Sequence, residues 1–129
     1  EAAEELLMLT AATESMCGRY LHQVGGPALG IYQMEPATAH DVWDNYLQFR
    51  QGLAAEIRTM GYGPQPLPGN LYYATAMARV HYLRVPEALP SAADEVGLAT
   101  YWKKYYNTYL GKGTAEKAVE MYRKYALVD

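Results

Sequence analysis

The positions of glycine and proline constrain the fold of this chain more than any other sequence feature. Both residues interrupt regular secondary structure, glycine because its backbone is permissive and proline because it lacks an N–H. They are concentrated in four segments, 18–33, 61–69, 86–90 and 111–113. Residues 61–69 alone hold three prolines and three glycines, which predicts a rigid surface connection. The chain therefore divides into stretches of helical length separated by loops.

The stretches between these breaks have the composition and periodicity of helices. Residues 2–16 are good helix formers with acidic residues in the first turn, where they complement the helix dipole. Residues 70–84 are apolar on nearly every side, as a buried helix is. Residues 115–125 repeat apolar side chains at helical spacing. Further helices are expected after Pro36, over 51–60 and over 91–107.

Some of these helices begin with capping signals. Thr38–Asp41 and Ser91–Asp94 have the spacing of a capping box, with Asp in place of Glu. Thr114 is placed to cap the last helix. We therefore predict one domain over residues 1–129, mainly α, of about six helices, with a Gly-rich loop or a short β-hairpin after the first helix.

The composition excludes several classes of protein. Half of the residues are apolar and 19% are charged, which suits a chain with a real core. A net charge of −3 gives no electrostatic case for nucleic-acid binding. No apolar stretch is long enough for a membrane span, and no basic segment followed by an apolar one indicates a signal peptide. Cys17 is the only cysteine, so an internal disulfide and a cysteine-rich zinc site are excluded.

Tyrosine dominates the aromatic residues, with 13 Tyr against 1 Phe and 2 Trp. A tyrosine packs like an apolar residue but carries a hydroxyl that needs a partner or water. Such a bias predicts many half-buried positions, as a cleft for a polar ligand would provide.

Glu14 is the most informative acidic residue. It lies where the first predicted helix ends, before a glycine-rich turn, with apolar residues near it in sequence. The negative end of the helix dipole and apolar neighbours both disfavour the charged carboxylate. A carboxyl that stays protonated near neutral pH can donate a proton to a glycosidic oxygen. The alternative is an ordinary surface glutamate.

The segment around Glu14 resembles the lytic transglycosylase and goose-type lysozyme superfamily. The hallmark is a catalytic Glu followed by Ser, and later a Gly-x-x-Gln-x-x-Pro-x-Thr-Ala run; here Glu14-Ser15 precedes Gly30-Ile-Tyr-Gln-Met-Glu-Pro-Ala-Thr-Ala39. The run lies about one residue later than is usual, and Tyr32 replaces the common Met. Of a further family segment, Ala-Tyr-Asn-Ala-Gly, only Tyr106-Asn107 is kept. The resemblance implies a lysozyme-like α+β fold.

The resemblance also implies roles for individual residues. Glu14 would be the general acid/base, and Ser15 would brace the following loop or bond near it. Gly30 would allow close approach of a sugar, and Gln33 would bond the substrate or orient the cleft. Tyr32 and Tyr106 would line the cleft with Glu14. Most of the other tyrosines, including Tyr72, Tyr73 and Tyr82, are expected to pack. The implied substrate-binding set is Ser15, Gly30, Tyr32, Gln33, Tyr106 and Asn107.

By this resemblance the chain would be a muramidase that cleaves the β-1,4 bond between N-acetylmuramic acid and N-acetylglucosamine in peptidoglycan. It would need no metal or organic cofactor and would act in the bacterial periplasm or cell wall. The sequence looks most like bacteriophage members, which implies carriage in a virion and other virion proteins as partners. The alternative is a non-catalytic lysozyme-like virion or secretion-system component that binds glycan or protein.

The outcome of cleavage depends on the number of carboxylates. A transglycosylase needs one Glu, because the sugar's own 6-hydroxyl closes onto C1, whereas a lysozyme commonly uses a second carboxylate. Glu35 is the best candidate for that second carboxylate, and Asp41 and Asp44 are the others.

Other candidate sites are weaker. Cys17 could act as a nucleophile with a histidine, but its place near a helix C-terminus favours a packed thiol. His40-Asp41 lacks a third metal ligand. The last 35 residues carry 6 of the 11 basic residues, which suits a solvated face or weak attraction to an anionic wall.

Overall fold

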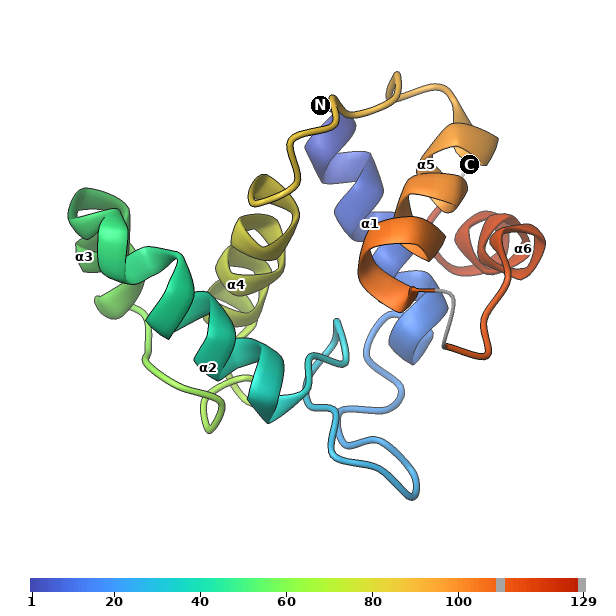
Figure 1. The fold of residues 1–129 in the computed structure, drawn as a ribbon. Helices are drawn as coiled ribbons and strands as arrows, with labels where there is room; N and C mark the ends of the chain where they lie inside the picture. Colours follow the sequence, from blue (N-terminus) through green and yellow to red (C-terminus); the bar gives the residue numbers. More distant parts are fainter. Residues whose placement is uncertain (109–110, 128–129) are drawn as a thin grey trace.

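Helices make up most of the described chain, residues 1–108 and 111–127 of the computed structural model (Figure 1). No strand forms within these residues. The prediction of a mainly α domain with about six helices is thus confirmed. The α-helices are α1 (Ala2–Ser15), α2 (Pro36–Asn45), α3 (Gln51–Arg58), α4 (Leu71–Leu83), α5 (Glu95–Trp102) and α6 (Ala115–Tyr125). Two shorter turns are the 3₁₀ turn η1 (Leu47–Phe49) and the π-helical turn η2 (Lys103–Asn107).

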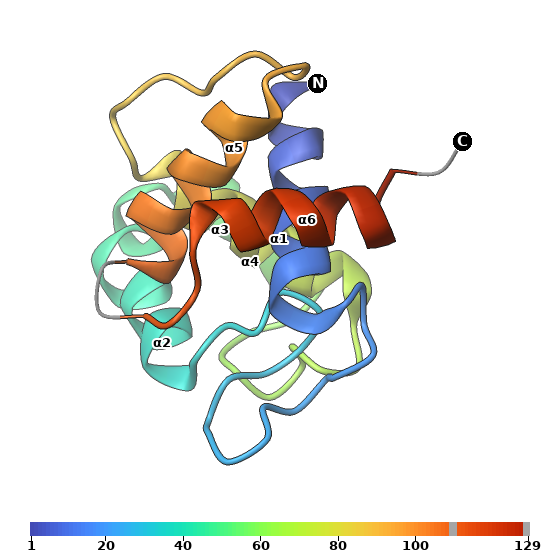
Figure 2. The same cartoon turned by 90° about the vertical axis from the view of Figure 1, so that its right-hand side faces the viewer.

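The helices form two groups, one around α1 and the other around α4. Helix α1 packs against α5 and α6, and α4 packs against α2 and α3 (Figures 1 and 2). Contacts between α1 and α4 join the groups. The largest fully buried side chains come from both groups and include Leu6, Leu9, Val42, Leu47, Tyr73, Met77, Leu98 and Trp102. One apolar core therefore runs through both groups.

The segment between α1 and α2 is a loop. Helix α1 ends with Met16 and Cys17 at φ 52° and 56°, followed by Gly18 at 99°, so the chain reverses in the left-handed region. Two isolated antiparallel bridges, His22 with Leu29 and Leu29 with Met34, are the sheet-like pairs in it. Of the two expected forms, the loop is therefore the one that occurs, and the β part of an α+β fold is absent from the described residues.

The observed caps correct part of the sequence interpretation. Thr114 caps α6 as expected, because its hydroxyl accepts a bond of 3.1 Å from the amide of Lys117. The predicted capping box at Thr38–Asp41 does not form, so that prediction is wrong. Helix α2 already begins at Pro36, whose missing N–H suits the first position. Helix α5 begins at Glu95, with the Asp94 carboxylate bonded to the amide of Gly97. The Ser91–Asp94 box is therefore wrong as well.

The tyrosines of α4 differ in burial. Tyr73 and Tyr82 are 0% and 2% exposed and pack as expected. Tyr72 was expected to pack too, but it is 82% exposed because it lies on the solvent side of the first turn. Helix α4 is thus buried along one face and not all round. No described helix is both long and apolar enough to cross a membrane.

Candidate functional site

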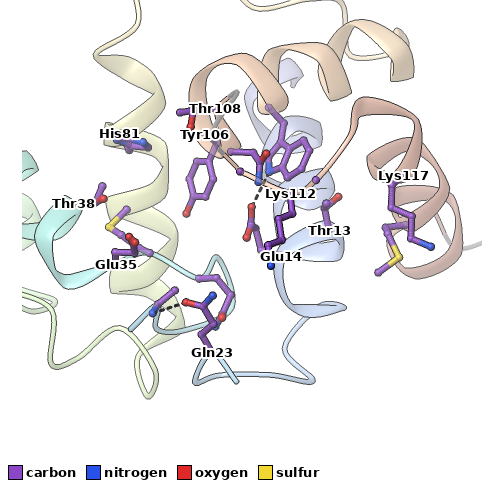
Figure 3. A pocket seen from close by; sticks show the side chains of 18 residues that line it. Thr13, Glu14, Gln23, Glu35, Thr38, His81, Tyr106, Thr108, Lys112 and Lys117 are labelled. Carbon is purple, nitrogen blue, oxygen red and sulfur yellow. Dashed lines mark hydrogen bonds between the residues drawn. The ribbon is translucent and has the colours of Figure 1, made fainter. Parts of the chain in front are cut away.

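A cavity of about 780 Å³ opens between the two helix groups, next to the loop that follows α1. Its size is typical of a site for a small organic ligand. Glu14 enters from α1 and His81 from α4, with Tyr106 beside them (Figure 3). The wall is completed by residues of the loop, of α2, α5, η2 and α6, and of positions 108 and 111–113 before α6; among them are Gln23, Gln33, Glu35, Thr38, Trp102, Asn107, Thr108, Lys112 and Lys117.

The pKa of the Glu14 carboxyl is strongly shifted in this site. Burial raises its pKa from 4.5 to about 7, and a hydrogen bond from Trp102 opposes that rise. In that bond the indole N–H donates to Oε2 over 3.0 Å. The expected direction of the shift therefore holds, with loss of hydration as its main cause. Near neutral pH the carboxyl exchanges readily between its acid and base forms, as an acid/base catalyst must.

Ser15 ties the end of α1 to the loop. Its hydroxyl donates to the carbonyl of Ile31 over 2.5 Å and accepts from the amide of Gly18 over 2.9 Å. The side chain is 1% exposed and does not line the cavity. Ser15 thus braces the loop, as expected, but the expectation that it contacts substrate is wrong because the core covers it.

Gly30 lies close to another segment of the chain, whereas a close approach to a sugar was expected. Its φ is +83°, and a Cβ there would lie 2.5 Å from the carbonyl oxygen of Leu67. Glycine is therefore required by the neighbouring chain segment and not by a sugar. Gly30 does not line the cavity, so its place in the substrate-binding set is wrong.

Gln33 lies in the cavity wall, as expected. Its φ is +49°, and its amide nitrogen donates to the carbonyls of Tyr20 over 3.1 Å and Gly30 over 2.9 Å. The donors of the side chain are thus used to hold the loop in shape. Non-glycine residues at positive φ are strained and cluster at functional sites, and Gln33 and Thr108 both lie in this wall.

The two tyrosines that were expected in the cleft lie in different places. Tyr106 lines the cavity and donates from its hydroxyl to the carbonyl of Tyr32 over 2.6 Å. The ring of Tyr32 is 7% exposed and bonds Thr75 at 3.0 Å inside the core. The expectation for Tyr32 is therefore wrong, since only its backbone reaches toward the site. Burial raises the pKa of the Tyr106 hydroxyl well above its usual range, so it acts as a neutral donor.

Tyr106 and Asn107 are placed by the π-helical turn η2. The sequence predicts one helix over 91–107, yet α5 ends at Trp102 and the backbone widens into a π turn. Such turns are rare and frequent at functional sites. The ammonium of Lys103 donates to Asn107 Oδ1 over 2.6 Å and to the carbonyl of Gly111 over 3.0 Å. Asn107 lies in the cavity wall, as expected, with its amide oxygen held by this lysine.

Glu35 is the second carboxylate of the cavity. It is the N-cap residue of α2 and lies across the cavity from Glu14 (Figure 3). Asp41 is engaged elsewhere, because its carboxylate binds Arg84 over 2.7 Å and Asn45 over 2.6 Å, and these bonds lower its pKa. Asp44 lies in a separate, smaller cavity. Glu35 is thus the candidate that the fold brings to Glu14.

The sequence interpretation missed several residues of the wall. Trp102 holds the Glu14 carboxyl, and His81 faces the cavity from α4. No local pattern marks either residue, because each reaches the site through packing between distant segments. Lys112 and Lys117 belong to the basic C-terminal part of the chain, and that enrichment was their one signal.

The competing sites find no support in the described residues. Burial raises the pKa of the Cys17 thiol, which disfavours a reactive thiolate, and Sγ lies 3.7 Å from the carbonyl of Tyr125. The part of the chain that the structure describes holds no group of three metal-ligating side chains.

Compared with known protein families, curated proteins and solved structures, the chain matches none.

Proposed function

We propose that this protein is a peptidoglycan-cleaving muramidase that acts on the bond between N-acetylmuramic acid and N-acetylglucosamine, with Glu14 as general acid/base. The observation that carries the proposal is the partly buried Glu14 carboxyl, whose pKa is about 7, in the wall of the cavity of about 780 Å³. The resemblance of residues 14–39 to lytic transglycosylases supplies the reaction class and the substrate.

Each form of Glu14 has a task in the proposed reaction. The protonated carboxyl gives its proton to the glycosidic oxygen as the bond from that oxygen to C1 breaks. The resulting carboxylate then takes the proton of the sugar's 6-hydroxyl as that oxygen bonds to C1, which leaves a 1,6-anhydro end. The Trp102 N–H keeps Oε2 in place and stabilises the carboxylate form.

The rest of the wall suits a sugar polymer. Tyr106 contributes an aromatic surface, and Gln33, Asn107 and Thr38 contribute polar groups. Saccharides are bound by this mixture of ring faces and hydrogen-bonding groups. Of the tyrosines in the η2 turn, Tyr106 is therefore the one that contributes to the proposed site.

Hydrolysis by water is the second outcome that the site favours, because Glu35 lies across the cavity from Glu14. In that case Glu35 would activate a water for attack on C1. Reducing ends in the product, and their loss in Glu35→Gln, would establish hydrolysis. Anhydro ends, and retention of activity in Glu35→Gln, support the transglycosylase reaction.

The non-catalytic alternative is favoured by one observation, that Tyr32 turns into the core where the resemblance implies a cleft residue. Loss of turbidity of purified peptidoglycan separates the two possibilities. Wild-type protein should clear the suspension, and Glu14→Gln should be slower by at least about a hundredfold. Glu56→Gln, an exposed glutamate of α3, is the matched control and should behave as wild type. Equal rates of clearing by wild type and Glu14→Gln would contradict the assignment of Glu14 as the catalytic residue.

A further inference from the structure

His81 faces the cavity and has no part in the proposed proton transfer. It projects from α4 toward Tyr106, across the cavity from Glu14 (Figure 3). The rings of His81 and Tyr106 meet edge to face, with centroids 5.3 Å apart and planes at 78°. This contact holds the imidazole in one orientation at the wall.

The two ring nitrogens of His81 have different surroundings. Nδ1 is closed off from solvent and has no hydrogen-bond partner among the described residues. Buried polar atoms without a partner are rare in folded proteins and call for an explanation. Because the side chain lines the cavity, Nε2 is the nitrogen that a bound ligand can reach.

The imidazole of His81 is neutral at the pH at which Glu14 titrates. Burial lowers the His81 pKa to about 4, the guanidinium of Arg84 contributes to that fall, and Asp41 opposes both effects. Arg84 binds Asp41 through Nη2 over 2.7 Å, which anchors the guanidinium between α4 and α2. A neutral imidazole carries one N–H and one lone pair.

The lack of a partner at Nδ1 decides which tautomer is favoured. Arg84 Nη1 is a second buried atom without a partner among the described residues, and it belongs to the residue one turn along from His81. No described residue accepts a hydrogen bond from Nδ1, so a proton there would be a buried donor without an acceptor, and the tautomer with a lone pair on Nδ1 is favoured. The proton of the ring then lies on Nε2, at the cavity.

We propose that His81 is a substrate-binding residue whose Nε2–H donates a hydrogen bond to a neutral oxygen acceptor of the glycan, a hydroxyl or an acetamido carbonyl. This inference rests on the proposed function in that the occupant of the cavity is an N-acetylated glycan. It does not depend on whether Glu14 performs catalysis.

Binding in the Glu14→Gln background tests the inference apart from catalysis. The probe is the soluble tetramer of N-acetylglucosamine, titrated by calorimetry. His81→Leu removes the donor and should weaken binding roughly three- to tenfold. His81→Gln carries an amide N–H at a comparable reach and should bind within about threefold of the parent. His40→Leu, an exposed histidine outside the cavity, is the matched control and should change nothing.

The pH dependence tests whether the imidazole stays neutral, while rescue by His81→Gln is the readout that a purely structural role would not supply. The ratio of affinities between parent and His81→Leu should be the same at about pH 5 and about pH 8, because the imidazole keeps its donor over that range. Thermal melts identify any variant that fails to fold, and His81→Gln keeps the test open if His81→Leu does not fold.

The outcomes distinguish this inference from the proposed function. Equal binding by parent and His81→Leu, or binding by His81→Gln as weak as by His81→Leu, overturns the role of His81 even if the wild type cleaves peptidoglycan. If tetramer binding depends on His81 but the wild type cleaves no peptidoglycan, the binding role of His81 is supported and the muramidase assignment is overturned. Absence of tetramer binding by the parent overturns the inference about His81.

Discussion

At the scale of single residues, the proposed chemistry depends on two opposing influences on Glu14. Burial raises the pKa of its carboxyl to about 7, while the bond from Trp102 lowers it. The sequence alone predicted the direction, because a glutamate at a helix end among apolar residues is poorly hydrated. The partner could not be predicted, since Trp102 is 88 positions away along the chain.

Trp102→Phe should raise the Glu14 pKa further. The substitution removes the indole N–H that favours the carboxylate and keeps an aromatic ring in the core. The basic limb of the pH–rate profile should therefore move to higher pH, and an NMR titration of Glu14 should show the same shift. Trp43→Phe is the control, because the Trp43 N–H binds Tyr73 and not Glu14. A basic limb that moves to lower pH contradicts the assignment.

The raised pKa of Glu14 should also cost stability. Since the pKa is about 7 in the folded protein and 4.5 for a glutamate in its ordinary, hydrated state, the folded form binds its proton more tightly than the unfolded form does. The penalty is absent below about pH 4.5, grows as the pH rises and is complete above about pH 7. Glu14→Gln should therefore be more stable than wild type at about pH 8 by about 1–3 kcal/mol. Urea unfolding at about pH 4 should show no such gain, and a gain of equal size at both pH values is inconsistent with a titrating Glu14.

At the scale of elements, the breaks between helices were predictable and the contacts across them were not. Residues 61–69 form the expected connection, and the glycines at 18–33 accompany the expected loop. These features are local, so glycine and proline report them directly. The π turn at Lys103–Asn107 was not predicted, because Tyr106 and Lys103 hold it through bonds to Tyr32 and Gly111.

Ser15 should be needed to position the loop at the cavity. Ser15→Ala removes the bonds to Ile31 and Gly18 and leaves partly buried backbone groups without these partners. We expect a loss of about 1–3 kcal/mol in unfolding free energy and a lower rate of peptidoglycan cleavage, because Gln33 lies in the same loop. Ser91→Ala, at an exposed turn with a longer bond of 3.3 Å, is the control and should lose far less. A fully stable Ser15→Ala protein argues against the brace.

At the scale of the whole molecule, the site exists because two helix groups meet around one cavity. The helices and their order followed from periodicity, but which side chains face one another depends on long-range packing. Gly30 illustrates the limit, because a close approach at this glycine was expected and its partner, Leu67, was not. Among the described residues, five tyrosines are buried in the core, and Tyr106 lies in the cavity wall; the five are Tyr32, Tyr73, Tyr82, Tyr101 and Tyr122.

The cavity also has a cationic side, which should make binding depend on salt. Lys112 and Lys117 lie in its wall, and peptidoglycan carries carboxylates on its peptide stems. The double substitution Lys112→Ala/Lys117→Ala should weaken binding to purified peptidoglycan about two- to fivefold at low ionic strength and less at high. Lys104→Ala, whose ammonium pairs with Glu87 away from the cavity, should leave binding unchanged. Identical salt dependence in the double variant and wild type speaks against the cationic side.

Mass spectrometry of the glycan ends released from purified peptidoglycan tests the central claim most directly. We expect wild-type protein to generate 1,6-anhydro ends and Glu14→Gln, at equal concentration and with the same fold by circular dichroism, to generate none above background. Release of no new ends by the wild type, or release of the same ends by Glu14→Gln, would contradict the claim that Glu14 is the general acid of a muramidase.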